Sequence, residues 1–410
     1  MDGSDFKVMK RITGRIVYTG SFRFPEGDAG AARVLGIAKA LRQAGYEVIM
    51  AGGEQDGRPE DRNGNGEYTY QGFPYRPLGH LNRGNHTVQR LLQYLRGGYD
   101  ASRWLTLQRR LGIDAILAYD PGSPMFLSLS RFARANRIPL ILDVAEWHQG
   151  SHLPGGRFGL RSIDSEQRMR FLYGRTGYVI AISSYLADFY RAKGCQVIRV
   201  PPLVDLTEPK WQAVPSKSSH VLRLVYAGNP GRKDLLANII RGLALLGNNR
   251  RQVELHLVGV TPDQVAAMLG TEGVSPLPGT TIIWRDKVSQ SCVPQILAGC
   301  DYSVLLRPHS RYAEAGFPTK FVESLSAGLP VITNVTSDIS EYLQDLDQGV
   351  IVPGYTPSAF AKAVERVITL SSDQHQRMRE KARARAMLFD YRTHAPEIGQ
   401  FVSDAIRHSS

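Results

Sequence analysis

Two oppositely charged side chains, Lys320 and Glu323, are three residues apart in a stretch typical of a loop, a short helix and a buried strand. Pro318 fits the first helical position, so the amides of Phe317 and Thr319 are expected beside the helix start, where the helix dipole favours an anion. Residues three apart share one helical face. A cation near the helix start suits a phosphate, and a carboxylate one turn deeper suits a pair of hydroxyls. The pair therefore predicts a site for the ribose and diphosphate of a nucleotide; the alternative is a solvated pair on a surface helix.

A second pair of cations, Arg232 and Lys233, lies in the Gly/Pro-containing loop 228–234, directly after an expected strand. A flexible backbone permits close approach to an anion, and the two charges would neutralise its oxygens. This loop is therefore a candidate diphosphate site, with a solvated basic turn as the alternative.

A carboxylate and an imidazole, Glu146 and His148, follow the apolar run 139–144, which is typical of a buried parallel strand. Ligands of open α/β sheets bind at the carboxyl ends of the strands. Glu146 is expected to bind an acceptor hydroxyl. His148 fits a ligand contact and a local hydrogen bond equally well.

The elements that must position these residues follow an α/β rhythm. A strand at 15–19, a glycine-bearing loop at 20–30, a helix at 31–44 and a strand at 46–50 form the first unit. Further strands are expected at 115–119, 139–144, 178–182, 196–200, 222–227, 254–258, 281–284 and 302–306. The glycine spacing of the first loop does not match the dinucleotide fingerprint, which disfavours a nicotinamide enzyme.

The stretch from Gly316 to Ile332 resembles the donor-binding motif of retaining glycosyltransferases of the GT-B fold, the large family (family 4-like, group 1) with the sucrose and mannosyl transferases. The resemblance implies that Glu323 binds the ribose hydroxyls and that Lys320 holds the diphosphate. It also implies that retention needs no protein nucleophile.

The chain departs from the family pattern at Ala315, where many members carry a glutamate that touches the donor sugar. Either the neighbouring Glu314 replaces it, or the backbone amides of Gly316 and Phe317 take that role.

Phosphate contacts in the family come from an Arg and a Lys of one loop. Here Lys233 matches the lysine, and Asn229 occupies the place of the arginine, so Arg232 is the expected replacement.

The resemblance implies three further contacts. His148 would meet the donor sugar or the pyrophosphate. Gly20 would allow close backbone approach to the donor phosphates, with a plain turn as the alternative. The loop that starts at Arg285 would recognise the nucleobase.

The chain is thus expected to form two Rossmann-like α/β domains that face a cleft. We expect an acceptor domain at 1–205, a donor domain at 206–390 and a tail, 391–410, that packs back on the first domain. The predicted reaction moves a sugar from a UDP- or GDP-sugar to a glycan, lipid-linked or small-molecule acceptor. We expect neither a metal nor a cofactor, because no Asp-x-Asp cluster stands out.

The composition limits the partners. The chain has 410 residues and a formal net charge of +12, which favours anionic partners such as sugar nucleotides or an anionic membrane surface. The basic segment 83–110 has the spacing of an amphipathic helix that lies on such a membrane, or of one that packs on its own domain. Three cysteines without metal spacing, and the lack of a signal or spanning segment, favour a cytoplasmic, peripheral protein.

Two other functions remain open at this point. A nucleotide-sugar 2-epimerase shares the two-domain cleft and would act without an acceptor. A non-enzymatic binder of anionic polymers would use the charge alone, but the arginines are scattered over several expected helices, which disfavours nucleic acid.

Overall fold

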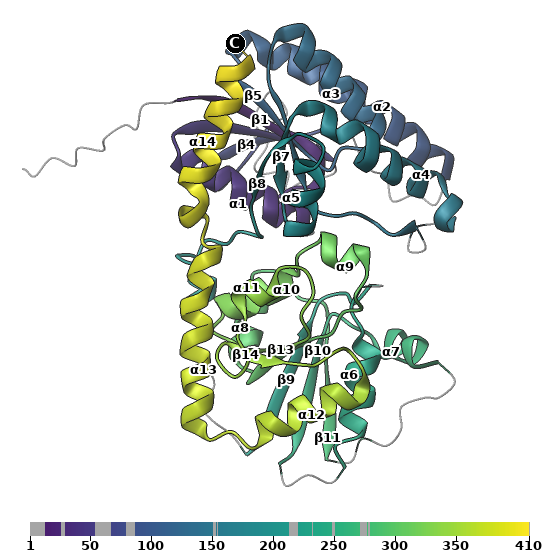
Figure 1. Ribbon diagram of the computed structural model, residues 1–410, viewed down its shortest axis with the longest axis vertical. Helices are drawn as coiled ribbons and strands as arrows, with labels where there is room; N and C mark the ends of the chain where they lie inside the picture. Colours follow the sequence, from purple (N-terminus) through teal and green to yellow (C-terminus); the bar gives the residue numbers. More distant parts are fainter. Residues whose placement is uncertain are drawn as a thin grey trace, which may run out of the picture.

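A computed structural model gives the architecture of the chain (Figure 1). It describes residues 13–25, 29–53, 67–78, 87–150, 153, 155–212, 220–231, 233–247, 251–270, 277 and 279–409; the side chains of residues 53 and 87–93 are not described. Two α/β units lie one above the other, each built around its own sheet. The expected fold class, two Rossmann-like domains, is confirmed.

The first sheet has the strand order β3-β4-β2-β1-β5-β6-β7-β8. All its neighbours pair in parallel except β3 and β4. The strands are β1 (Gly14–Arg23), β2 (Tyr46–Gly53), β3 (Tyr68–Tyr70), β4 (Phe73–Pro77), β5 (Ala115–Tyr119), β6 (Leu140–Val144), β7 (Tyr178–Ala181) and β8 (Gln196–Arg199). Strands such as β6 are buried along their whole length, because helices cover both faces of a parallel sheet.

The helices of this unit connect successive strands. They are α1 (Ala29–Gln43), α2 (Thr87–Gln108), η2 (Arg109–Leu111), α3 (Ser123–Asn136), η4 (Gly156–Phe158), α4 (Leu160–Gln167), the π-helical η5 (Arg168–Leu172), η6 (Tyr173–Thr176) and α5 (Ser184–Arg191). The expected helix at 83–110 corresponds to α2 and η2, and its residues 83–86 lie outside the described part. Ala101, Trp104 and Leu105 of α2 are buried in the domain core, so one face of this helix packs on its own domain.

The second sheet is parallel throughout, with the order β11-β10-β9-β12-β13-β14. Its strands are β9 (Leu222–Ala227), β10 (Val253–Val258), β11 (Thr280–Arg285), β12 (Tyr302–Leu305), β13 (Val331–Thr333) and β14 (Gly349–Ile351). Its helices are α6 (Leu236–Ala244), α7 (Pro262–Leu269), α8 (Val293–Ala298), α9 (Arg311–Ala315), α10 (Thr319–Ser326), α11 (Ile339–Tyr342) and α12 (Pro357–Ile368).

The chain crosses between the two units twice. The first crossing follows β8 and leads through η7 (Pro209–Gln212). The second runs from α13 (Ser372–Arg385) through η9 (Ala386–Phe389) into α14 (Tyr391–Ser409), which lies along the first unit (yellow in Figure 1). There α14 packs closely against the end of α1: a Cβ on Gly399 would lie 2.6 Å from that of Ala44, the residue that follows α1. A bridge between Val204 and Asp390 joins the two crossings.

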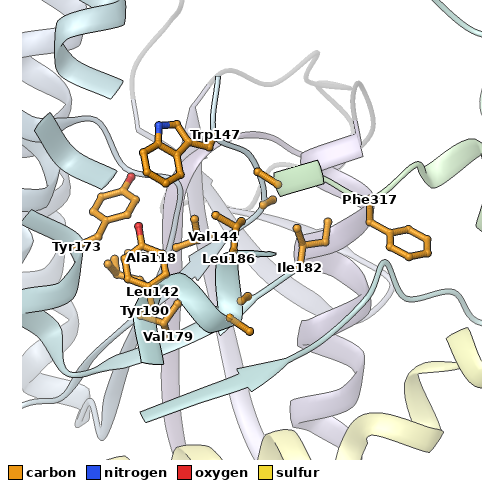
Figure 2. Close-up of a cluster of buried hydrophobic side chains, with 14 of the residues drawn as sticks. Ala118, Leu142, Val144, Trp147, Tyr173, Val179, Ile182, Leu186, Tyr190 and Phe317 are labelled. Atoms are coloured by element: carbon orange, nitrogen blue, oxygen red, sulfur yellow. The ribbon is translucent and has the colours of Figure 1, made fainter. Parts of the chain in front are cut away.

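One apolar cluster continues from the first unit into the second. Figure 2 shows it around Trp147, Tyr173 and Leu186, with Phe317 of the second unit at its edge. Phe317 packs there against Phe321, Tyr342 and Phe389, at ring-centroid distances of 5.6–6.1 Å. These rings belong to the second unit and the second crossing; the Ser183 hydroxyl of the first unit donates to the Ala315 carbonyl of the second at 2.8 Å and so joins the two units.

Candidate donor and acceptor site

The helix α10 carries both charged residues of the predicted nucleotide site, Lys320 and Glu323. Phe321, Val322 and Leu325 are buried on its inner face, whereas Lys320 and Glu323 are only partly buried. Pro318 is the N-cap and Thr319 the first helical residue, so the helix begins one position later than expected. Since its apolar face is fixed in the core, the helix points both charged side chains away from it.

Lys320 is held by a cluster at the carboxyl edge of the second sheet. Its Nζ lies 2.6 Å from Asp234 Oδ2, 2.9 Å from the hydroxyl of Tyr226 and 3.2 Å from the carbonyl of Asn229. Gly228 adopts a φ of +99°, and a Cβ there would lie 3.3 Å from Lys320 Cε. The glycine therefore gives the lysine both the turn and the space that it needs.

Asp234 is the centre of this cluster, although no role was predicted for it from the sequence. Its Oδ1 accepts from Arg307 Nε at 2.9 Å, and its Oδ2 accepts from the Tyr226 hydroxyl at 2.6 Å. Burial alone would raise the pKa of this carboxyl, but the charges of Lys320 and Arg307 outweigh it and lower the pKa. Burial in turn lowers the pKa of Lys320, against the opposing effect of Asp234. One carboxylate thus fixes two cations that lie 73 and 86 residues further along the chain.

Glu323 lines a cavity between the two units. The cavity is also lined by Gly36 and Lys39 of α1, by Leu203 and Lys210 of the first crossing and by Pro294 of α8. Burial raises the pKa of Glu323, and Lys320 and Lys210 partly offset this effect. The carboxylate that was expected to bind ribose hydroxyls therefore lies where both units contribute to one hollow.

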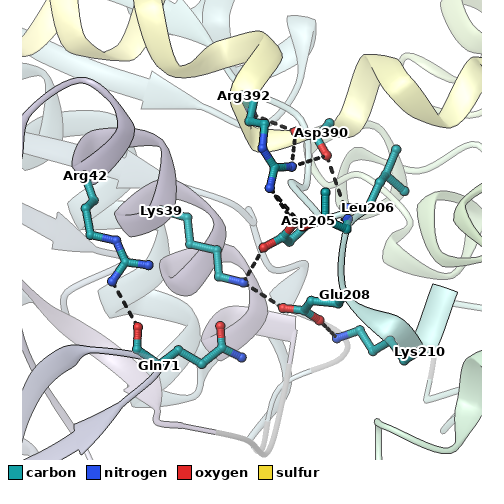
Figure 3. Close-up of polar contacts among 10 residues, drawn as sticks. Lys39, Arg42, Gln71, Asp205, Leu206, Glu208, Lys210, Asp390 and Arg392 are labelled. Carbon is teal, nitrogen blue, oxygen red and sulfur yellow. Dashed lines mark hydrogen bonds and ion pairs between the residues drawn. The ribbon is translucent and has the colours of Figure 1, made fainter. Parts of the chain in front are cut away.

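The wall of this cavity next to Glu323 is a network of ion pairs. Lys39 Nζ lies 3.0 Å from Asp205 and 2.6 Å from Glu208, and Asp205 also accepts from Arg392 at 3.0 Å (Figure 3). The bonded Thr207, Lys39 and Arg392 lower the pKa of Asp205 despite its partial burial. Through this network α1 and both crossings are fixed to one another.

Glu146, His148 and Lys233 meet between the two units. Lys233 Nζ forms an ion pair with Glu146, and His148 Nε2 lies 3.4 Å from the same carboxylate. The ring of Tyr312, on α9, lies against Lys233 and His148. Its centroid is 4.1 Å from Lys233 Nζ and 5.2 Å from the centroid of the His148 ring. Burial opposes ionisation of Glu146, but Lys233 and His148 lower its pKa overall. The residues expected to serve the acceptor and the diphosphate are therefore in direct contact.

Asp120 supports this region from the end of β5 and was missed by sequence reasoning. Its Oδ2 accepts from the amide of Ala145, directly before Glu146, at 3.2 Å. Burial raises its pKa to about 7, with Arg168 opposing the shift. An aspartate directly after a buried strand, at the ligand-binding edge, was the signal that could have identified it.

The side chains next to Ala315 are engaged or buried, so mainly their backbone groups remain for contact with a ligand. Glu314 accepts from the amide of Ser337 at 2.8 Å and lies 3.3 Å from His309. The Phe317 side chain is 6% exposed and belongs to the aromatic cluster described above, so only its backbone can face a ligand. At Gly316 a Cβ would meet only ordinary contacts, at 3.6 and 3.7 Å.

Three other predicted site residues lie at the edges of this arrangement. Gly20 has a φ of +142°, and a Cβ there would lie 2.2 Å from the carbonyl oxygen of Tyr119. The neighbouring strand β5 therefore explains the glycine without a ligand. Arg285 ends β11, and its Nε donates to His256 Nδ1 at 3.3 Å, along the sheet. Arg232 lies outside the described residues.

Comparison with known proteins agrees with the fold. The family model described as "Glycosyl transferase 4-like domain" matches residues 29–203, and that described as "Glycosyl transferases group 1" matches residues 209–385. Together the two models match most of the chain, which therefore belongs to this glycosyltransferase family. No curated protein matches it.

Solved structures show the same two-domain architecture. Sucrose-phosphate synthase from Thermosynechococcus elongatus superposes with a TM-score of 0.68 at 14% identity, covering 96% of this chain and 100% of that one. Anabaena Alr3699/HepE in complex with UDP and glucose superposes with a TM-score of 0.62 at 17% identity, covering 95% of this chain and 100% of that one. WaaG, a glycosyltransferase involved in lipopolysaccharide biosynthesis, superposes with a TM-score of 0.63 at 16% identity, covering 94% of this chain and 99% of that one. The chain thus has the GT-B fold.

Neither a spanning helix nor a metal cluster is present among the described residues. They contain no helix with the length and apolar character that crossing a membrane requires. They also contain no group of three or more His, Cys, Asp or Glu side chains placed to hold a metal ion.

Proposed function

We propose that the chain is a retaining glycosyltransferase that moves a sugar from a UDP- or GDP-sugar to a glycan, lipid-linked or small-molecule acceptor without a metal. The observation that carries the proposal is the geometry of α10. On this one helix Lys320 is fixed by Asp234 beside the second sheet, and Glu323 lines a cavity between the domains. Cation and carboxylate are arranged for the diphosphate and the ribose of one nucleotide.

Each side chain has a distinct task. Glu323 accepts hydrogen bonds from the ribose hydroxyls. Lys320 and Lys233 neutralise the charge that builds on the diphosphate as the bond to the sugar breaks, which is the step that preorganised cations stabilise most. Arg232 is assigned to the same anion from the sequence alone. The backbone amides of Gly316, Phe317 and Thr319 add donors near the helix start.

The acceptor domain supplies the other half. Glu146 lies beside both His148 and Lys233, so its carboxylate is placed to bind an acceptor hydroxyl while the imidazole meets the donor sugar. Similar proteins support the donor class, because HepE and an Escherichia coli trehalose-6-phosphate protein have been solved with UDP, UDP-glucose or a UDP-2-fluoro-glucose.

The proposal is tested with a donor screen on the purified chain. Nucleoside diphosphates are ranked by the rise in melting temperature, and the matching sugar nucleotide is then assayed with candidate acceptors. Lys320→Ala is expected to lower turnover at least about a hundredfold, whereas Lys362→Ala, an exposed lysine on α12, is the matched control. Equal turnover of Lys320→Ala and the wild type would contradict the assigned role.

Three further measurements test the remaining parts of the proposal. Retention is tested by determining the anomeric configuration of the product by NMR. Activity that persists after EDTA treatment tests metal independence. Epimerised sugar nucleotide formed without any acceptor would favour a 2-epimerase instead.

A further inference from the structure

The segment η4–α4–η5 turns a row of large apolar side chains away from the acceptor domain. Phe158, Leu160, Ile163 and Phe171 are 77, 74, 51 and 66% exposed. The opposite face is buried, through Ser162, Ser165, Arg168, Met169 and Leu172. Single exposed apolar residues are ordinary, but several gathered along one helical segment indicate an interaction surface.

Two positive charges of this segment lie on the same exposed face as its apolar side chains. Arg157 and Arg161 are exposed beside the apolar side chains. Both carboxylates of the segment are engaged and only partly exposed. Asp164 accepts from the amide of Ser123 at 3.1 Å, and Glu166 from Trp147 Nε1 at 3.2 Å. The outward face is therefore a mixture of apolar side chains and guanidinium groups.

We propose that this face, which we call the α4 surface (Arg157, Phe158, Leu160, Arg161, Ile163 and Phe171), lies on an anionic lipid bilayer. Apolar side chains that insert at the headgroup level, flanked by arginines that meet anionic headgroups, are the recognised composition of an interfacial helix. A two-fold contact with a second copy would bring the same arginines together. A nucleic-acid backbone offers Leu160 and Ile163 no apolar partner.

The α4 surface also lies beside the proposed site. Glu166 pairs with Arg311 on α9, directly before the donor motif, and Arg311 stacks on Trp147 at 4.6 Å. A bilayer on this surface would therefore lie next to the gap in which Glu146 and Lys233 meet. That the bilayer delivers a lipid-linked acceptor rests on the proposed function, whereas the binding itself does not.

The location differs from the one that the sequence suggested. The sequence left the segment 83–110 open between a membrane helix and a helix that packs on its own domain, and in α2 the residues Trp104 and Leu105 are buried in the domain core. Leu95 and Tyr99 of α2 are 53 and 67% exposed, so this helix provides a direct competitor for the same role.

Flotation with phospholipid vesicles tests the proposal on the full chain. The wild type is expected to float with phosphatidylcholine vesicles that contain phosphatidylglycerol, and much less with phosphatidylcholine alone or at high salt. The variant Phe158→Ser/Leu160→Ser/Phe171→Ser is expected to bind at least about tenfold more weakly, because it removes the inserted apolar groups. The control Leu111→Ser/Leu245→Ser/Met387→Ser changes three comparably exposed side chains elsewhere and is expected to bind like the wild type.

Four outcomes would overturn the proposal: a wild type that stays in solution, a triple variant that floats unchanged, binding lost in Leu95→Ser/Tyr99→Ser alone, or a dimer in light scattering that only the triple variant dissolves. Circular dichroism and thermal unfolding of each variant establish that it is folded. No sugar donor is present, so a failure here leaves the proposed function intact, and a failed donor screen leaves the lipid binding intact.

Discussion

Lys233 of the second unit and Glu146 of the first unit form an ion pair, although they are 87 residues apart in the chain. Glu146 is also held by His148, and Lys233 lies over Tyr312. A lysine with one ammonium group cannot give its full charge to both a carboxylate and a diphosphate. Under the proposed function, the donor therefore competes with Glu146 for Lys233.

This competition gives the first prediction. Glu146→Gln is expected to tighten UDP binding about fivefold, because removing a partly exposed ion-pair partner worth about 1 kcal/mol releases Lys233. Turnover with acceptor is expected to fall in the same variant, since the acceptor loses its carboxylate. Isothermal titration and initial rates measure the two effects.

Glu341→Gln is the matched control for this experiment. It breaks the ion pair between Arg199 and Glu341, which also joins the two domains, but at a distance from Lys233. Its UDP affinity is expected to equal that of the wild type. Weaker UDP binding in Glu146→Gln would show that Glu146 positions the lysine instead of competing for it.

The second prediction concerns the buried carboxylate of Asp234. Asp234→Asn leaves Lys320 and Arg307 without their shared counter-charge and is expected to lower the free energy of unfolding by about 3–5 kcal/mol at pH 7. Because the folded-state pKa of Asp234 is lowered, its contribution is complete above the unfolded value of about 3.9 and is lost as the pH falls through the folded value. Urea unfolding at pH 7 and pH 3 should show the difference shrinking in acid. A variant as stable as the wild type at pH 7 would exclude this role.

The third prediction concerns the ribose contact proposed for Glu323. Glu323→Ala is expected to weaken UDP binding about tenfold or more, as a charged hydrogen bond is lost. The same substitution should have a much smaller effect on 2′,3′-dideoxy-UDP, which lacks the hydroxyls. Titration of both ligands into both proteins measures the coupling. Equal losses for the two ligands would place Glu323 away from the ribose.

The fourth prediction uses the raised pKa of Asp120. In the folded chain this carboxyl keeps its proton up to about pH 7, whereas in the unfolded chain it loses it near 3.9. The folded state therefore binds more protons between these values, and stability falls as the pH rises through this window. Asp120→Asn removes this titration, so the variant should gain stability relative to the wild type from pH 5 to pH 8. The free energies of unfolding of both proteins are measured at pH 5 and pH 8. The same difference between variant and wild type at both pH values would contradict the assignment.

The local sequence was enough to predict α10, because helix capping, helix spacing and strand propensity all act within a few residues of Lys320 and Glu323. It was not enough for Asp234, whose partner Arg307 is 73 positions away, or for the contact between Lys233 and Glu146. Such pairings depend on how two sheets and two domains are placed. Phe317 shows the same limit: it stands in the donor motif, yet an aromatic cluster visible only in three dimensions buries its side chain.

The two connections between the domains are themselves hydrogen-bonded, with the Val204 amide donating to Phe389 and its carbonyl accepting from Tyr391, at 2.9 and 3.0 Å. These two bonds tie the crossings at one level, so a displacement of either crossing has to break them or carry the other crossing with it.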